Sequence, residues 1–324
     1  MLVDALLPLL RCPVSGRPLA ERDGMLVSDD GANAYELRDG VPILLARGHS
    51  VFDDDTLERR SADERSLGAR LGARLSAMRS RNLAAEHACA RLLAELRRQA
   101  PEDGSHAAPR RPRVLVIGGR IEGPGLSLLL AEPGVELVES DVALGPRTQI
   151  VCDAHDLPFA DGSFDAVVAQ AVMEHVLDPQ RVAAEVHRVL APDGLVYSDT
   201  PFLQQVHEGA YDFTRFTLSG HRRLWRWFDE IEAGVSGGPG MALAWTIGAT
   251  ARTAVGGTRV GRALALLLAA AAGALLTRLD PYLIRRASAS DAASATWFLG
   301  HRRETPVDDR VIVERYRGAG TPAA

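Results

Sequence analysis

The segment from Asp153 to Phe202 constrains the fold of this chain more than any other part. It reads DAHDLPFADGSFDAVVAQAVMEHVLDPQRVAAEVHRVLAPDGLVYSDTPF, in which an apolar strand, a helix and a second apolar strand follow one another. Continuous apolar runs of strand length are typical of parallel strands buried on both faces. Ligands bind at the carboxyl ends of such strands. The segment therefore predicts an α/β fold with its chemistry in these loops.

Strand-like and helix-like runs alternate through residues 113–302, which we take as the main domain. This alternation predicts a Rossmann-like, mostly parallel seven-stranded sheet with helices on both faces. The predicted strands are 114–118, 135–141, 149–154, 164–170, 194–200, 228–234 and 295–302, and the predicted helices include 126–130 and 179–190.

The rest of the chain predicts smaller units around this domain. Residues 1–47 predict a β-rich module whose strands at 25–28, 34–37 and 41–45 form an antiparallel meander. Residues 48–112 predict a charged linker or exposed helix to about residue 82, an amphipathic helix over 82–100 and a Pro-rich break. Residues 303–324 are expected to be a C-terminal tail.

Composition excludes several classes of function. The net charge of -5 gives no reason to expect a nucleic-acid partner. The chain contains no lysine, so Schiff-base chemistry on a lysine is excluded. Cys12, Cys89 and Cys152 have the spacing of neither a disulfide framework nor a zinc site, which suits a reducing cytoplasm. The apolar start lacks a basic region, so we expect no signal peptide.

An apolar insert, residues 241–286, interrupts the main domain. Its densest run, ALALLLAAAAGALL, is shorter than the roughly 20 residues that span a bilayer. Dominance of alanine favours helices that cover the sheet or a partner surface. The alternative is peripheral contact with a membrane, because arginines flank the run at positions 259, 262, 278, 285 and 286.

A glycine-bearing turn, IGGRIEGPG, lies between the first predicted strand and the next helix, where a glycine lets the backbone approach a ligand closely. Together with VESD, DAHDLPF and AVMEHV, this turn resembles the class I S-adenosylmethionine-dependent methyltransferases of the type-11-like kind. The resemblance departs at Val116, where the family commonly has Asp or Glu. It implies methyl transfer from S-adenosylmethionine to an O, N or C atom of a small-molecule or glycan acceptor.

The resemblance also implies which residues contact the cofactor. The glycine turn would lie under it, an acid at the end of the second strand would bind the ribose, and the following loops would pass the adenine and the methyl group. Asp141 is the first choice for the ribose and Glu139 the alternative. The full set is Gly118, Gly119, Gly123, Glu139, Asp141, Asp153, Ala154 and Gln170.

The candidate catalytic residues are His175, His207, Asp212 and Arg215. The last three belong to TPFLQQVHEGAYDFTRFT, which resembles an HDYFRFT-like signature of bacterial methyltransferases. His207 or Asp212 could accept a proton from the acceptor, and Arg215 could bind an acidic group. Two structural interpretations stand beside these roles: His175 holds its loop, and Asp212 pairs with Arg215 to fix the loop.

The first module, with its YELRDGVPILL, resembles the zinc-ribbon-like domains of the Trm112 type. Of the two CxxC pairs usual in that family, only Cys12 remains; Ser15 stands at its partner position and the second pair is absent around 28–31. We therefore expect a ribbon without metal, and no metal site elsewhere.

Two other functions stay open for the whole chain. One is a non-catalytic cofactor sensor or scaffold. The other, less favoured, is a nicotinamide-dependent dehydrogenase, which shares the glycine turn.

Overall fold

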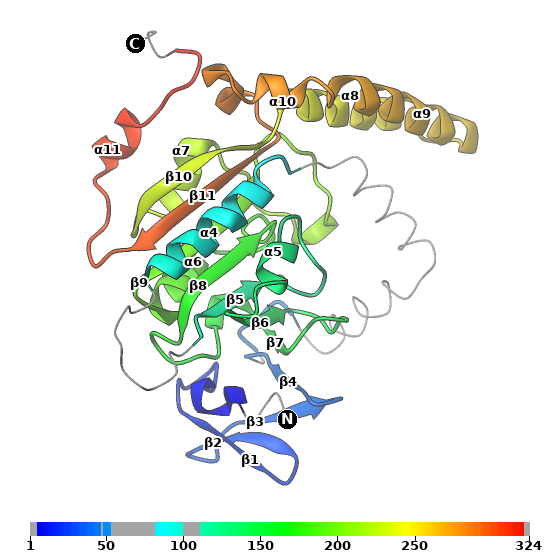
Figure 1. Cartoon of the computed structure of the whole chain (residues 1–324). Coiled ribbons are helices and arrows are strands. Elements are labelled where there is room, and N and C mark those ends of the chain that lie inside the picture. Colours follow the sequence, from blue (N-terminus) through cyan, green and yellow to red (C-terminus); the bar gives the residue numbers. More distant parts are fainter. Residues whose placement is uncertain (1–4, 47, 53–81, 100–110, 321–324) are drawn as a thin grey trace.

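One sheet of eleven strands runs through the computed structural model, which describes residues 5–46, 48–52, 82–99 and 111–320 (Figure 1). The strand order is β1-β2-β3-β4-β7-β6-β5-β8-β9-β11-β10. Most of the linker predicted over residues 48–82, namely 53–81, and most of the break predicted over 101–113, namely 101–110, lie outside the described residues. The strands are β1 (Leu19–Arg22), β2 (Met25–Ser28), β3 (Ala34–Arg38), β4 (Val41–Leu44), β5 (Arg113–Ile117), β6 (Glu136–Asp141), β7 (Ile150–Cys152), β8 (Phe164–Gln170), β9 (Leu190–Pro201), β10 (Phe228–Gly237) and β11 (Ala295–Arg302).

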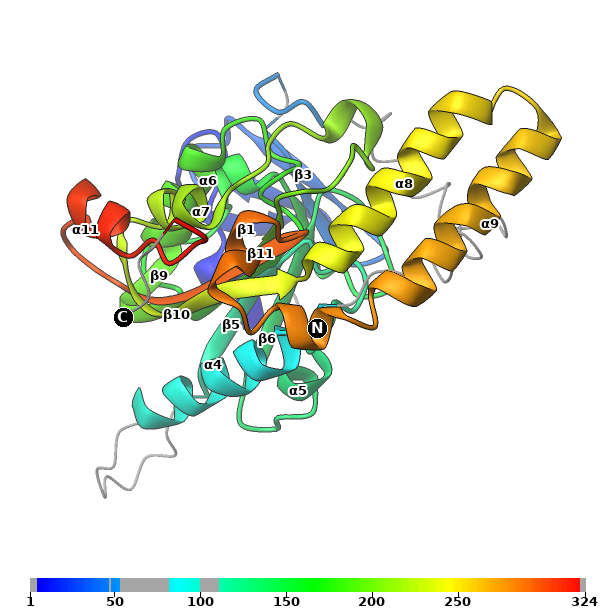
Figure 2. The same ribbon diagram turned by 90° about the horizontal axis from the view of Figure 1, so that it is seen from above.

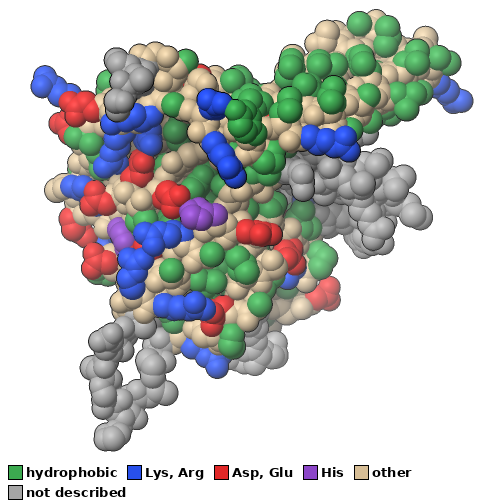
Figure 3. Space-filling model, turned by 45° about the horizontal axis from the view of Figure 1, so that its top comes forward, with side chains coloured by type: hydrophobic (Ala, Val, Ile, Leu, Met, Phe, Trp, Pro, Cys, Tyr) green, Lys and Arg blue, Asp and Glu red, His purple; other side chains and the backbone are tan. Residues whose placement is uncertain are grey.

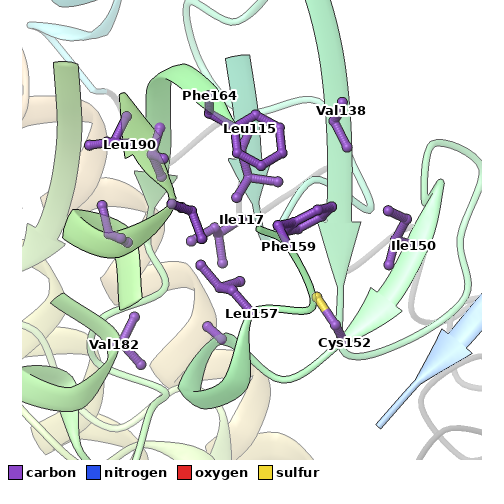
Figure 4. Close-up of a cluster of buried hydrophobic side chains, with 14 of the residues drawn as sticks. Leu115, Ile117, Val138, Ile150, Cys152, Leu157, Phe159, Phe164, Val182 and Leu190 are labelled. Atoms are coloured by element: carbon purple, nitrogen blue, oxygen red, sulfur yellow. The ribbon is translucent and has the colours of Figure 1, made fainter. Parts of the chain in front are cut away.

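The central seven strands, β7-β6-β5-β8-β9-β11-β10, confirm the predicted fold class. Neighbours from β7 to β9 pair in parallel, whereas β11 pairs antiparallel with both β9 and β10. Side chains along β5 alternate between two cores: Leu115 and Ile117 face one side of the sheet, and Val114 and Val116 face the other. Figure 4 shows the first of these cores, where Phe159 lies near Cys152 and Leu157.

Helices cover both faces of the sheet (Figures 1 and 2). The helix α4 lies on one face, where Leu92 packs in the same core as Val114. The helix α6 lies on the other face and begins at Pro179, with the Asp178 carboxylate accepting a hydrogen bond from the Arg181 N–H. The helices are α4 (Ala85–Gln99), α5 (Ser127–Leu130), α6 (Pro179–Val189), α7 (Leu218–Leu224), α8 (Pro239–Val255), α9 (Arg259–Leu276), α10 (Asp280–Leu283) and α11 (Asp309–Glu314), with short 3-10 turns at Leu7–Leu9, Ala154–Asp156, Gly209–Tyr211 and Ala287–Asp291.

The N-terminal module extends the main sheet. Strands β1 to β4 pair antiparallel with one another, as the meander predicts, but β4 also pairs in parallel with β7. Ile43 lies opposite Val151 and Leu44 opposite Cys152. An exposed strand edge is a ready template for another strand. The apolar β4 covers the edge of β7, so the module and the domain share one sheet.

Hydrogen bonds occupy the positions where the module would hold a metal. The Cys12 thiol lies 3.1 Å from the Tyr35 hydroxyl and accepts a bond from the Ser15 N–H at 3.4 Å. The Ser28 hydroxyl donates to Asp30 at 2.6 Å. Nearby, Cys12 also lines a cavity of about 580 Å³ between the module and the loop at Asp156–Asp161.

The insert forms helices, as predicted, but of the surfaces predicted for them the sheet is not the one that they cover. Helices α8 and α9 pack antiparallel on each other and extend away from the rest of the molecule (Figure 2). Close packing of the pair depends on small residues, since a Cβ at Gly248 would lie 2.8 Å from the Ala269 Cβ. The predicted C-terminal tail contains a helix, α11.

Candidate active site

The glycine turn follows β5 and lies against two neighbouring segments. Gly118 has φ +77°, and a Cβ there would lie 2.7 Å from the Val172 side chain. The Gly119 N–H donates to the Ser140 carbonyl at 2.9 Å. Gly123 leaves room for Gln170, whose side-chain amide donates to the Pro124 carbonyl at 2.9 Å. Two predicted cofactor contacts, the turn and Gln170, therefore lie side by side.

Two acids at the end of β6 have different surroundings. Asp141 is half-buried, and its carboxylate accepts hydrogen bonds from the N–H groups of Arg120 at 3.3 Å and Ala143 at 3.1 Å. Glu139 is buried and makes a bidentate ion pair with Arg147 at 2.8–2.9 Å. Burial raises the pKa of Glu139 even though Arg147 opposes the shift. Asp141 thus remains the first choice for a ribose, because it lies against the glycine turn.

Asp153 is committed to its own loop. Its buried carboxylate accepts hydrogen bonds from the His155 ring at 2.6 Å, from the His155 N–H at 3.0 Å and from the Ser50 hydroxyl. Burial alone would raise the pKa of Asp153, but these bonds hold it below its usual value. The predicted contact between this carboxylate and an adenine amine stays a prediction, and it would have to form beside these three bonds. The other contact predicted for an adenine ring in this loop is the backbone at Ala154, a residue that is 5% exposed.

Val116, where a carboxylate was expected by resemblance, is only 4% exposed and belongs to the core between the sheet and α4. A charged side chain buried there without a partner would be costly. The departure from the family pattern is therefore a packing feature of this chain, and this position supplies no polar contact to a ligand.

A second group of side chains lies beyond β8. Glu174 is fully buried, and one of its carboxylate oxygens, Oε1, has no hydrogen-bond partner. That oxygen lies 3.6 Å from His175 Nε2 and 4.0 Å from His207 Nε2. Its other oxygen accepts a long hydrogen bond of 3.5 Å from Thr200. Burial raises the pKa of Glu174 to about 8.

Both histidine rings are held in place through their Nδ1 atoms. His175 Nδ1 donates to the Tyr211 carbonyl at 2.8 Å, and His207 Nδ1 lies 3.3 Å from Asp212. The two rings meet edge to face with centroids 4.8 Å apart. Their Nε2 atoms therefore face Glu174. Burial lowers the pKa of His175, which favours its neutral form.

This trio can perform two kinds of chemistry. A neutral imidazole beside a carboxylate can accept and pass on a proton. One ligand-type atom from each of Glu174, His175 and His207 also lies within 4.8 Å of the others, so the trio has the donor set for a transition-metal ion, although the sequence predicts no metal. The role of Glu174 was not predicted, because only burial distinguishes it from an ordinary loop carboxylate.

Asp212 and Arg215 form an internal network. The two carboxylate oxygens of Asp212 bind the two terminal guanidinium nitrogens of Arg215, which also donates to the carbonyls of Gln204 at 3.0 Å and Gln205 at 3.2 Å. Arg215 holds the pKa of Asp212 well below its usual range. These contacts correspond to the structural interpretation: the pair fixes the loop that carries His207. They leave neither a basic carboxylate nor a guanidinium for an acceptor.

The methyltransferase-domain family matches residues 129–198. A protein of Micromonospora griseorubida named as a putative 23S rRNA (guanine-N(1)-)-methyltransferase is 32% identical over 218 residues, which are 63% of this chain and 69% of that protein. An uncharacterized methyltransferase of a Mycobacterium strain is 35% identical over 102 residues, so the chain spans about two fifths of its length, 39%.

A solved structure, the Burkholderia thailandensis 1,6-didemethyltoxoflavin-N1-methyltransferase with bound 1,6-didemethyltoxoflavin and S-adenosylhomocysteine, is also similar. It is 14% identical with a TM-score of 0.41, and the match covers 85% of this chain and 98% of that one. The Micromonospora protein, by contrast, is similar in sequence over more than two thirds of its length. Given that match and the seven-stranded sheet, the chain belongs to the methyltransferases and has their class I fold.

Proposed function

We propose that this protein transfers a methyl group from S-adenosylmethionine to a hydroxyl-type acceptor at the carboxyl edge of its sheet. The observation that carries the proposal is the trio Glu174, His175 and His207. Glu174 and His175 lie in the loop after β8, which ends at Gln170, and His207 lies in the loop after β9. Gln170 in turn contacts the glycine turn. Cofactor-type and proton-transfer groups therefore lie at one edge, as expected for an open α/β sheet.

The residues present fit the nucleoside part of the cofactor. Asp141 can accept hydrogen bonds from the ribose hydroxyls and lies against the glycine turn, and the backbone of Ala154, in the next loop, can contact the base. When bound, S-adenosylmethionine supplies an electrophilic methyl group. The protein then has to align the acceptor and remove its proton.

We assign proton removal to His207. Asp212 holds its Nδ1 side, so Nε2 is the atom that can accept a proton from the acceptor hydroxyl. Glu174, 4.0 Å from that Nε2, faces the positive charge that forms on the ring. A base of this kind is needed only for acceptors of high pKa, such as hydroxyls, which favours a glycan or alcohol.

Two other functions are less favoured. The name of the Micromonospora relative specifies an rRNA guanine, but a net charge of -5 does not suit a polyanionic partner. A non-catalytic scaffold would not require an unpartnered carboxylate oxygen between two oriented imidazoles.

Asp141→Asn is expected to weaken the binding of S-adenosylhomocysteine by roughly 5- to 150-fold, the effect of about 1–3 kcal/mol from unpaired buried hydroxyls. Titration calorimetry on the full chain measures this affinity. Asp161→Asn, at a carboxylate whose side chain is 81% exposed, is the matched control and should bind as the wild type. Unchanged affinity in Asp141→Asn would move the ribose role to Glu139, and no binding by the wild type would overturn the proposed function.

A further inference from the structure

The α8–α9 hairpin exposes an unusual amount of apolar surface. Helix α9 is the one described helix that is long and apolar enough to cross a membrane, with a mean hydropathy of 1.7, yet only 11% of it is buried in the protein. Leu264, Leu267 and Leu275 are 57%, 67% and 66% exposed. Figure 3 shows this apolar surface along the projecting hairpin. Contiguous patches of this kind mark interaction sites, because their exposure to water is unfavourable.

The charges on the hairpin are all of one sign. No acidic residue occurs between positions 233 and 279. Asp280 follows, but it is 1% exposed and accepts hydrogen bonds from the N–H groups of Gly240 at 2.7 Å and Met241 at 2.9 Å. The exposed arginines lie in two groups: Arg252, Arg259 and Arg262 at the tip of the hairpin, and Arg278, Arg285 and Arg286 at its base.

We propose that the hairpin lies flat on the surface of an anionic phospholipid membrane. Apolar side chains would enter the acyl boundary while guanidinium groups at both ends bind lipid phosphates. End-on insertion is disfavoured, because it would carry the arginines at the tip into hydrocarbon. A second copy of the chain fits less well, since it would bring the same positive groups together.

The base of the hairpin contacts the loop that carries His207. The Gln205 side chain donates to the Thr246 hydroxyl of α8 at 3.1 Å, and a groove of about 430 Å³ lies between this loop and α8. Docking on a membrane would therefore bring the loop to the lipid surface. This inference about the acceptor rests on the proposed function. If the protein methylates a hydroxyl group while docked on a membrane, its acceptor is an amphiphilic hydroxyl compound held in that membrane.

Co-sedimentation of the full chain with vesicles tests the proposal. We expect at least tenfold more binding to phosphatidylcholine–phosphatidylglycerol vesicles than to phosphatidylcholine alone, with a decrease as salt is added. The double variant Leu264→Glu/Leu267→Glu should bind the anionic vesicles at least tenfold more weakly than the wild type. The double variant Arg259→Gln/Arg262→Gln should bind several-fold more weakly, and only to the anionic vesicles. Val313→Glu on α11, where the valine is 72% exposed, is the matched control and should bind as the wild type.

A wild type that does not sediment with anionic vesicles would overturn the proposal, as would a leucine variant that binds like the wild type. A dimer in light scattering that the leucine variant disrupts, without vesicle binding, would instead identify a subunit interface. If that variant fails to fold, the fluorescence of Trp245 on α8 tests the proposal instead, because brominated lipids should quench it when the hairpin contacts the membrane. The measurement uses a Trp227→Phe background, and the other two tryptophans, Trp225 and Trp297, are buried. Calorimetry with S-adenosylhomocysteine tests the proposed function separately.

Discussion

Gly125→Ala is expected to lower the free energy of unfolding by about 3–5 kcal/mol. Gly125 has φ +74°, a conformation that costs an alanine about 1–2 kcal/mol. A Cβ there would also lie 2.6 Å from the carbonyl carbon of Ala85 and 2.9 Å from the N–H nitrogen of Glu86. These are backbone atoms at the start of α4, so no side-chain rotation can relieve the contact. The helix would have to move off the sheet.

Gly209→Ala separates the two contributions. Gly209 also has a positive φ, +59°, but no atom lies within 4 Å of its would-be Cβ. The free energy of unfolding of Gly209→Ala should therefore fall only by the cost of a positive φ for alanine, about 1–2 kcal/mol. Urea unfolding of both variants measures the difference, and hydrogen exchange of α4 shows where Gly125→Ala acts. Equal losses in the two variants would show that α4 adapts to the added methyl group.

Glu174→Gln is expected to gain about 2–4 kcal/mol in free energy of unfolding, relative to the wild type, when the pH is raised from acid to alkaline. Burial raises the pKa of Glu174 from its ordinary 4.5 to about 8, so the folded wild type binds a proton that the unfolded chain releases. Stability from this group is complete below about pH 4.5 and is lost as the pH rises through about 8. Glutamine does not ionise, so the variant lacks this loss.

Urea unfolding at acid and alkaline pH measures this effect. Glu304→Gln is the control, because the Glu304 side chain is 79% exposed and its variant should follow the wild type at every pH. Asp199 is buried in the same region and its pKa is raised to about 7, so part of the alkaline loss should persist in Glu174→Gln and disappear in Glu174→Gln/Asp199→Asn. An identical pH dependence in Glu174→Gln and the wild type would show that Glu174 is ionised in the fold.

The proposed base adds an independent consequence. The same substitution leaves His207 and Asp212 unchanged, so binding of S-adenosylhomocysteine should be unaffected. Above about pH 8, where the Glu174 carboxylate is ionised, the substitution would also remove its electrostatic support for a protonated His207. Glu174 therefore contributes to the proposed proton transfer at the expense of stability in alkaline solution, which is a common trade at functional sites.

Much of the fold could be predicted because buried parallel strands carry a local signal. The run from Val114 to Gly118 is apolar throughout and the run from Phe164 to Gln170 is apolar at its centre, and each corresponds to a strand of the structure within one residue. The pairing of β4 with β7 could not be predicted in this way. Residues 43 and 151 are far apart in the chain, and each strand alone is compatible with several neighbours.

The sequence alone determined the chemical types at the candidate site and their order along the chain, because glycine turns, strand-end acids and loop histidines are read from neighbouring residues. Only the tertiary structure decided which of them can act. Asp153 and Asp212 are engaged by His155 and Arg215, whereas Glu174 is buried with an oxygen left unpartnered. The hairpin follows the same rule: its apolar composition is local, but its exposure depends on what the rest of the chain leaves uncovered. Burial and pairing are set by distant segments, and these decide the pKa and the availability of a side chain.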